Sequence, residues 1–281
     1  MGCVPRSSRD DCASGRRRPV WWILAGGTFA VAVLASLLGQ GGGVLYTPLQ
    51  VWLGIDFHHA ATTSLFLIMV TSVAASLVFS RAKRIDWPLA ISLEAVDAVA
   101  GFAGGLGSAS LSGATLSAIF AAVALTAATF MILPTNGHRP YADGGGGLLV
   151  WKRTLGDQCY SVNMALALPL SIVAGVLSGM VGVGGGVIKV PLMVLLLGVP
   201  MEIAVGSSAM MVGLTASGGF FGHVLRGHWD WKLSLVLAVV VFVGAQIGSR
   251  VTVRLDERKL RVAFGAFLAV VAATMVFKAL S

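Results

Sequence analysis

The stretch Gly182-Val-Gly-Gly-Gly-Val-Ile-Lys-Val-Pro191 decides the fold, because a copy of its pattern, Gly39-Gln-Gly-Gly-Gly-Val-Leu-Tyr-Thr-Pro48, lies 143 residues earlier. Both copies interrupt long apolar runs. A glycine in the interior of a helix costs about 1 kcal/mol relative to alanine. Three consecutive glycines at two corresponding places therefore predict two broken helices.

The two copies belong to a longer internal repeat. The residues that recur at an offset of 143 are Gly39, Gly41, Gly42, Gly43, Val44, Pro48, Leu49, Val51 and Leu53. After a one-residue insertion, Ala60, Ser64, Asp86 and Trp87 recur as Ala204, Ser208, Asp230 and Trp231 at an offset of 144. Self-similarity of this extent predicts an internal duplication.

The composition is that of a membrane protein. Hydrophobic residues make up 56% of the chain, charged residues only 11%, and the mean hydropathy is +0.86. A net charge of +8 is typical of nucleic-acid binding in a soluble chain. Here the basic residues fall between apolar runs and none forms a patch interleaved with aromatic residues. We therefore expect no nucleic-acid partner and attribute the basic residues to membrane topology.

The apolar runs predict an all-α, polytopic helical membrane protein. They cover residues 20–38, 44–53, 65–79, 87–106 and 114–133 in the first half and residues 166–181, 187–197, 203–221, 233–248 and 260–280 in the second. A helix that crosses a bilayer needs about 20 residues, so the runs after the glycines predict short or re-entrant helices. The expected domains are a basic cytoplasmic tail (1–19), a first membrane repeat (20–133), a flexible linker (134–161) and a second membrane repeat (162–281).

The Lys and Arg residues offer a test of topology. If the short helices re-enter without crossing, each half has four crossings, the halves are parallel, and most basic residues lie inside the cell. If the short helices cross, each half has five spans, the halves are inverted, and more basic residues lie outside than inside. The positive-inside rule favours the parallel arrangement, although inverted repeats are common in transporters.

The ordered pattern Gly-x-Gly-Gly-Gly-x-x-x-x-Pro, then Ala-x-x-[Thr/Ser]-Ser, then a basic turn ending in Asp-Trp occurs twice between residues 20 and 280. It resembles the TauE/SafE family, also called the toluene-sulfonate uptake permease family. The resemblance implies a secondary carrier for small anions, chiefly sulfite, sulfoacetate and other organosulfonates, often acting as an exporter. The chain departs from the family at Thr62, where the family tends to have glycine, as the second half does at Gly206.

The glycine breaks are the predicted anion site. Non-helical backbone at membrane depth is tolerated only where protein or a water-filled cavity satisfies it. Glycine lets backbone N–H groups approach a ligand, and a helix that starts there directs its positive end toward an anion. We expect Gly41, Gly42 and Gly43 to converge with Gly184, Gly185 and Gly186 on one substrate near the mid-plane. The alternative is that these glycines only allow close helix packing.

Lys189 is the most informative single residue, because a cation between Val187 and Pro191 is costly in hydrocarbon and usually functional. Its counterpart in the first half is Tyr46. We expect the ammonium and the phenol hydroxyl to bind oxygens of the substrate. The alternative is that Lys189 extends to a membrane interface.

Hydroxyl residues follow each short segment at Thr63, Ser64, Ser207 and Ser208. Their family position and their place near a predicted helix start suggest that they bind anion oxygens; plain helix capping is the alternative. Asp86 and Asp230 precede helices and are expected to act as caps.

Glu94 and Asp97 lie three residues apart, on one face of a predicted helix inside an apolar run. Carboxylates buried in a membrane carry protons in many transporters, which makes these two residues candidates for proton coupling. The alternatives are a water-filled vestibule or a pair with a basic loop residue.

Motifs for catalysis or metal binding do not occur in the predicted spans. The three cysteines, Cys3, Cys12 and Cys159, have unrelated spacings. We therefore expect no enzyme activity, no cofactor and no metal.

The function that we predict is secondary transport, as a probable exporter, of a small sulfur-containing anion across the inner membrane of a bacterium. An anion channel that uses the same glycine-lined site is the alternative. The expected partners are this anion, the lipid bilayer and protons as a coupling ion, and a homo-oligomer is left open.

Overall fold

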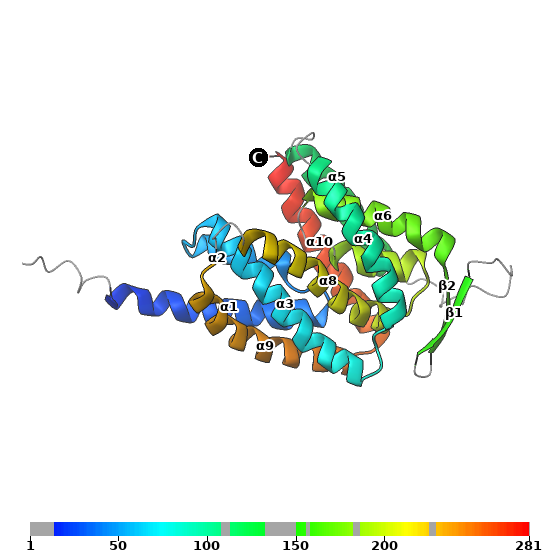
Figure 1. Cartoon of the computed structure of the whole chain (residues 1–281), viewed down its shortest axis with the longest axis horizontal. Helices are drawn as coiled ribbons and strands as arrows, with labels where there is room; N and C mark the ends of the chain where they lie inside the picture. The colour runs from blue at the N-terminus through cyan, green and yellow to red at the C-terminus, as the bar shows by residue number, and fades with distance from the viewer. Residues whose placement is uncertain are drawn as a thin grey trace, which may run out of the picture.

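The computed structural model describes residues 14–107, 113–132, 150–155, 158–181, 186–224 and 229–280 (Figure 1). The first half of the chain consists of helices α1 (Ser14–Leu37), α2 (Gly43–Trp52), α3 (Phe57–Arg81), α4 (Trp87–Gly107) and α5 (Gly113–Ile132). The second half consists of β1 (Val150–Leu155), β2 (Gln158–Asn163), α6 (Met164–Val181), α7 (Gly186–Pro191), the π-helix η2 (Leu192–Leu196), α8 (Met201–Val224), α9 (Trp231–Arg254) and α10 (Glu257–Leu280).

The prediction of a helical membrane protein is confirmed. Each apolar run forms a helix, and the runs after the two glycine stretches form the short helices α2 and α7 with η2. Within the described residues, three helical segments are long and apolar enough to cross a membrane: His59–Arg81, Met201–Phe221 and Trp231–Arg254. The internal duplication itself stays a prediction.

Two local predictions need correction. Residues 150–155 and 158–163, which begin inside the expected flexible linker and extend two residues past its end, instead form an antiparallel hairpin with Val150 opposite Asn163. Helix α1 begins at Ser14, within the expected basic tail. Polar residues at a helix start do not prevent helix formation when the apolar face that follows is packed against other helices.

Positive backbone angles explain the first glycine break. Gly39, Gly41 and Gly42 have φ values of 67°, 69° and 86°, a region that residues with a side chain rarely adopt. α1 therefore ends at Leu37, the chain turns through these glycines, and α2 begins at Gly43. In the second copy, residues 182–185 lie outside the described part of the chain, and α7 begins at Gly186.

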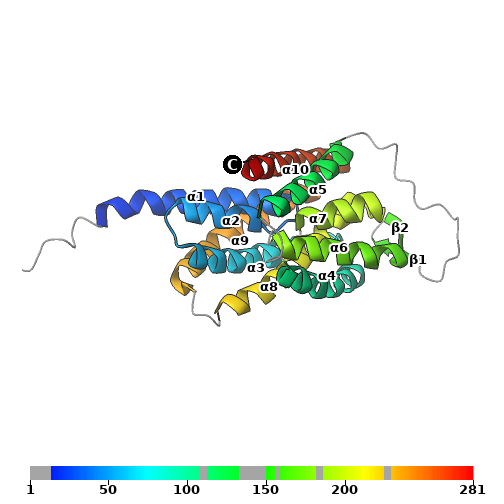
Figure 2. The same ribbon diagram turned by 90° about the horizontal axis from the view of Figure 1, so that it is seen from above.

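The main helix contacts join one half of the chain to the other. α1 packs against α9, α3 against α8, α4 against α6, and α5 against α10. In both views α5 and α10 lie side by side, while the β1–β2 hairpin and the start of α1 lie at opposite ends of the molecule (Figures 1 and 2). When each helix is replaced by its counterpart in the other half, the same set of contacts results.

Corresponding helices of the two halves run in opposite directions. α3 and α8 are counterparts, and they are antiparallel, because Ser72 contacts Ala209 whereas Leu65, earlier in α3, lies beside Gly219, later in α8. This antiparallel pair is the arrangement expected of inverted repeats, whereas the basic residues favour parallel ones, and the orientation of the two halves in the membrane stays a prediction.

The count of basic residues on each side depends on the short helix that follows the first glycine break. α2 folds back along α1, with Gly42 beside Ala35 and Leu49 beside Gly27. At 1.5 Å per residue, α2 is only about 15 Å long. The pair α1–α2 thus forms a helical hairpin in the first half of the chain.

Hydrogen bonds to Asp86 connect the β1–β2 hairpin to the start of α4. Its buried carboxylate accepts hydrogen bonds from Arg153 Nε at 2.9 Å and Arg153 Nη2 at 2.6 Å, from the hydroxyl of Tyr160, and from the backbone N–H of Leu89. Burial alone raises the pKa of Asp86, but these donors outweigh it and hold the pKa below its ordinary value. Asp86 and its counterpart Asp230, which accepts from the backbone N–H of Lys232 and Leu233, are helix caps as predicted.

Substitution of Gly206 tests the helix packing. A Cβ at Gly206 would lie 2.2 Å from the carbonyl oxygen of Arg84, whereas a Cβ at Gly218 in the same helix meets nothing within 4 Å. We expect Gly206→Ala to destabilise the protein by about 1–3 kcal/mol through overpacking. Gly218→Ala, as the control, should be neutral or stabilising, since alanine favours a helix. Thermal unfolding in detergent measures both, and equal midpoints would contradict the packing described.

Acidification tests the attachment of the hairpin. Because the pKa of folded Asp86 is depressed, its stabilisation is fully present above the unfolded value of about 3.9 and is lost as the pH falls through the folded value. We expect Asp86→Asn to reduce the free energy of unfolding at neutral pH by at most about 1.5–3 kcal/mol for each charged hydrogen bond lost, and hence to lower the thermal midpoint. The difference from the wild type should disappear in acid. Asp230→Asn removes a cap without a basic partner and should cost less.

Candidate functional site

Lys189 forms a buried ion cluster with two carboxylates. It lies on α7, and only 3% of its surface is exposed. Its Nζ atom is 2.6 Å from Glu94 Oε2 and 2.8 Å from Asp97 Oδ2, and both carboxylates lie on α4 and are buried. The ion pairs therefore join the short helix of the second half to a long helix of the first.

Thr215 of α8 completes this cluster. Lys189 Nζ donates to Thr215 Oγ1 at 3.2 Å, and the hydroxyl of Thr215 donates to Glu94 Oε1. Both oxygens of Glu94 thus have a donor. Asp97 Oδ1, in contrast, is buried without a hydrogen-bond partner among the described residues. We call Lys189, Glu94, Asp97 and Thr215 the lysine cluster.

The cluster decides between several of the sequence-based alternatives. Lys189 does not extend to an interface, because it is 3% exposed and its charge is paired inside the helix bundle. Glu94 and Asp97 pair with a lysine on a membrane helix, rather than with a basic loop residue. Sequence reasoning missed Thr215, although its counterpart is another threonine, Thr71.

Tyr46 forms the corresponding contact in the first half. Its hydroxyl is 3.0 Å from Thr71 Oγ1, and Thr71 in turn donates to the carbonyl oxygen of Leu67. Tyr46 therefore donates to Thr71. The counterparts of Glu94 and Asp97 are Ala238 and Val241, so this half of the structure has a neutral pair where the other has the lysine cluster. Tyr46 and Lys189 share no hydrogen-bond partner among the described contacts.

The two glycine breaks meet. A Cβ built on Gly186 would lie 2.9 Å from the Cα of Gln40, and the side chain of Val212 packs against both Gly41 and Gly186. Gly43 is the first residue of α2, and Gly184 and Gly185 lie outside the described residues. Lys189 lies three residues after Gly186, about 4.5 Å further along the helix axis.

Two polar side chains without partners lie at this junction. Gln40 Nε2 and Ser208 Oγ are buried and have no hydrogen-bond partner within the described parts of the chain. Ser208 lies on the α8 face that carries Val205 and Val212, whose side chains pack against Gly39 and Gly41. Unpaired buried donors are rare and call for a ligand or water. The sequence signal for Gln40 was a polar amide where the second copy has Val183.

The other predicted hydroxyl residues have partners in neighbouring helices. Ser64 accepts from Gln50 Nε2 at 3.0 Å, Ser207 accepts from the backbone N–H of Asp86 at 3.1 Å, and Thr63 accepts from Ser234 at 3.4 Å. α3 begins at Phe57 and α8 at Met201, six residues before Thr63 and Ser207. Only the first four N–H groups of a helix are free, so these residues have no free N–H groups, contrary to expectation.

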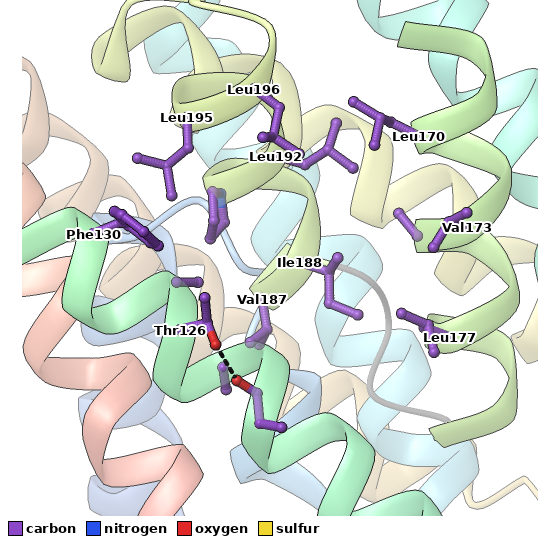
Figure 3. Close-up of a pocket in the computed structure, with 15 residues that line it drawn as sticks. Thr126, Phe130, Leu170, Val173, Leu177, Val187, Ile188, Leu192, Leu195 and Leu196 are labelled. Carbon is purple, nitrogen blue, oxygen red and sulfur yellow. Dashed lines mark hydrogen bonds between the residues drawn. The ribbon is translucent and has the colours of Figure 1, made fainter. Parts of the chain in front are cut away.

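A separate pocket lies between α5, α6, α7 and η2 (Figure 3). Its volume is about 600 Å³, and its lining side chains are apolar except for Thr126. The hydroxyl of Thr126 donates to the carbonyl oxygen of Ala122 in its own helix. Lys189 is not among the lining residues. The side chains that line this pocket therefore offer no free hydrogen-bond donor to an anion, unlike those at the glycine junction. No metal-binding group of three His, Cys, Asp or Glu residues occurs in the described ranges.

Comparison with known proteins agrees with this architecture. The profile of the family described as "Sulfite exporter TauE/SafE" matches residues 23–275. The probable membrane transporter protein YunE of Bacillus subtilis is 26% identical over 81% of this chain and 86% of its own. The probable membrane transporter protein MJ0441 of Methanocaldococcus jannaschii is 22% identical over 88% of this chain and 92% of its own.

A third relative, a probable membrane transporter protein of Haemophilus influenzae, is 26% identical over 87% of this chain and 94% of its own. No solved structure matches the chain. The family match covers nearly all of the helical region, including both glycine breaks and the lysine cluster. The chain therefore belongs to the TauE/SafE sulfite exporter family and is a membrane transporter whose helices cross the membrane several times.

Proposed function

We propose that the protein is a secondary transporter that exports a small sulfur-containing anion, such as sulfite, sulfoacetate or another organosulfonate. The observation that carries this proposal is the junction of the two glycine breaks. There, the donors Gln40 Nε2 and Ser208 Oγ are buried without a hydrogen-bond partner among the described residues, and a buried lysine follows Gly186 one helical turn later.

The chemistry of the junction suits an anion with several oxygens. An amide N–H, a hydroxyl and an ammonium are all hydrogen-bond donors, and hydrogen bonds to a charged acceptor are the strong ones. A sulfite or sulfonate group presents three oxygens to such donors. The family description names sulfite, which supports this substrate class and the direction of export.

The proposed substrate site has Gln40, Ser208 and Lys189 at its centre. The remaining predicted residues are proposed to surround or support this site, and those within the described residues are Gly41, Gly42, Gly43, Tyr46, Thr63, Ser64, Gly186 and Ser207. Gly184 and Gly185 belong to the same proposal but lie outside the described residues. An anion channel would use the same site. A carrier is favoured because Gln40 and Gly186 are in contact and Lys189 is held by two carboxylates, so that substrate entry needs a rearrangement.

Ligand-induced thermal stabilisation tests the site. We expect one of sulfite, sulfoacetate, simple sulfonates, sulfate or acetate to raise the unfolding midpoint of the purified protein. Gln40→Met and Ser208→Ala should weaken this anion about tenfold or more, the effect of losing a hydrogen bond to a charged group. Neither should lower the midpoint of the unliganded protein, because each removes an unpaired donor.

The control for this experiment is Ser249→Ala. Ser249 is buried, and its hydroxyl donates to the carbonyl oxygen of Ala245 in its own helix, α9. Its substitution should leave the affinity unchanged. Wild-type affinity in both Gln40→Met and Ser208→Ala would remove the junction as the binding site, and no stabilisation by any anion would contradict the substrate class.

Flux measurements distinguish a carrier from a channel. In proteoliposomes, we expect uptake of the labelled anion to saturate with concentration, and unlabelled anion on the opposite side to accelerate it by exchange. These properties follow from a site that is exposed to one side at a time. A conductance that rises linearly with anion concentration, without exchange, would instead show a channel.

A further inference from the structure

The lysine cluster contains one ammonium and two carboxylates, and this imbalance leads to an inference that rests on the proposed anion transport. The side chains of Lys189, Glu94 and Asp97 are at most 5% exposed. When both carboxylates are ionised, the cluster has one negative charge in excess. Buried charges without a partner are costly. A substrate anion that binds near Lys189 adds another negative charge, which must be balanced by a positive charge or a proton.

On the described helices that pack against the cluster, no other charged group lies close enough to supply that compensation. The helices that pack against α4 and α7 are α5, α6, η2 and α8. The sequences of α5, α6 and η2 contain no Asp, Glu, His, Lys or Arg. α8 contains Glu202, which pairs with Arg84 at 3.0 Å, thirteen residues before Thr215, and His223, eight residues after it. Eight residues of helix correspond to about 12 Å.

The two carboxylates of the cluster are not equivalent. Glu94 receives hydrogen bonds on both oxygens, from Lys189 and from Thr215. Asp97 has Lys189 on one oxygen, and its Oδ1 atom is buried without a partner among the residues described. Donors stabilise the ionised form of a carboxylate. Asp97 is therefore held in the cluster by fewer hydrogen bonds than Glu94 is.

We propose that the substrate anion and the Asp97 carboxylate exchange places on Lys189 Nζ, with one proton taken up by Asp97 for each anion bound. The anion forms the ion pair with the ammonium that Asp97 leaves, and the proton binds a carboxylate oxygen of Asp97. Glu94 keeps its pair with Lys189 and its hydrogen bond from Thr215 throughout. Release on the other side of the membrane reverses both steps.

This exchange keeps the buried charge constant. Before binding, the cluster holds one ammonium and two carboxylates. After binding, it holds one ammonium, the Glu94 carboxylate and one monovalent anion, while Asp97 is neutral. Anion and proton thus move together, and no net charge crosses the membrane. The rate of transport of a monovalent anion should therefore not respond to membrane potential, whereas a bare anion gains about 2.3 kcal/mol per 100 mV.

The experiment measures binding of a simple alkanesulfonate, which stays ionised at every pH used, by calorimetry on the full-length protein. For the wild type, we expect affinity to rise tenfold for each unit that the pH falls while Asp97 is ionised, with one proton taken up per anion. Asp97→Asn should bind the sulfonate at least as tightly as the wild type does at high pH, with no pH dependence and no proton uptake.

Glu94→Gln, on the same helix, is the matched control and should keep the pH dependence and the proton uptake. Both variants leave one ammonium with one carboxylate, so neither creates an unpaired buried charge. Sulfonate binding by the wild type without proton uptake, or pH-dependent binding by Asp97→Asn, would overturn this inference while leaving the anion site intact. Absence of sulfonate binding in all three proteins at every pH would overturn both the inference and the proposed function.

Discussion

The buried charge of Lys189 is the constraint on which the rest of the structure depends. An ammonium at this depth must be paired, and both of its carboxylate partners lie on α4, in the other half of the chain. Gly186, the first residue of α7, places this short helix against the first glycine break, where it contacts Gln40. The helix breaks, the helix packing and the ion pairs thus all stabilise the same junction.

The two halves share a backbone plan but differ in chemistry. Tyr46 and Thr71 occupy the places of Lys189 and Thr215, and the first pair is neutral while the second is charged. Inverted halves with equal side chains would present equal sites to the two sides of the membrane. Here the charged groups Lys189, Glu94 and Asp97 lie at one of the two corresponding positions, whereas the other holds the neutral pair Tyr46 and Thr71, so the two positions have different electrostatic environments.

The sequence allowed the helices, the glycine breaks and the caps at Asp86 and Asp230 to be predicted, because each depends on local residue patterns. The pairing of Lys189 with Glu94 could not be predicted, since 95 residues separate them. The charge count could not decide between parallel and inverted halves, because it depends on whether a ten-residue helix such as α2 reverses the chain. Gln40 and Ser208 became informative only when the structure showed which polar atoms had no partner.

The packing of each half against the other also affects how the protein is made. α1 leaves the ribosome first, yet its main partner α9 begins about 190 residues after α1 ends. Domains generally fold in the order of their synthesis, but here neither half contains the partners that its own first and fourth helices need. The first half must therefore remain in the lipid bilayer without the helices that it packs against, until translation of the second half is nearly complete.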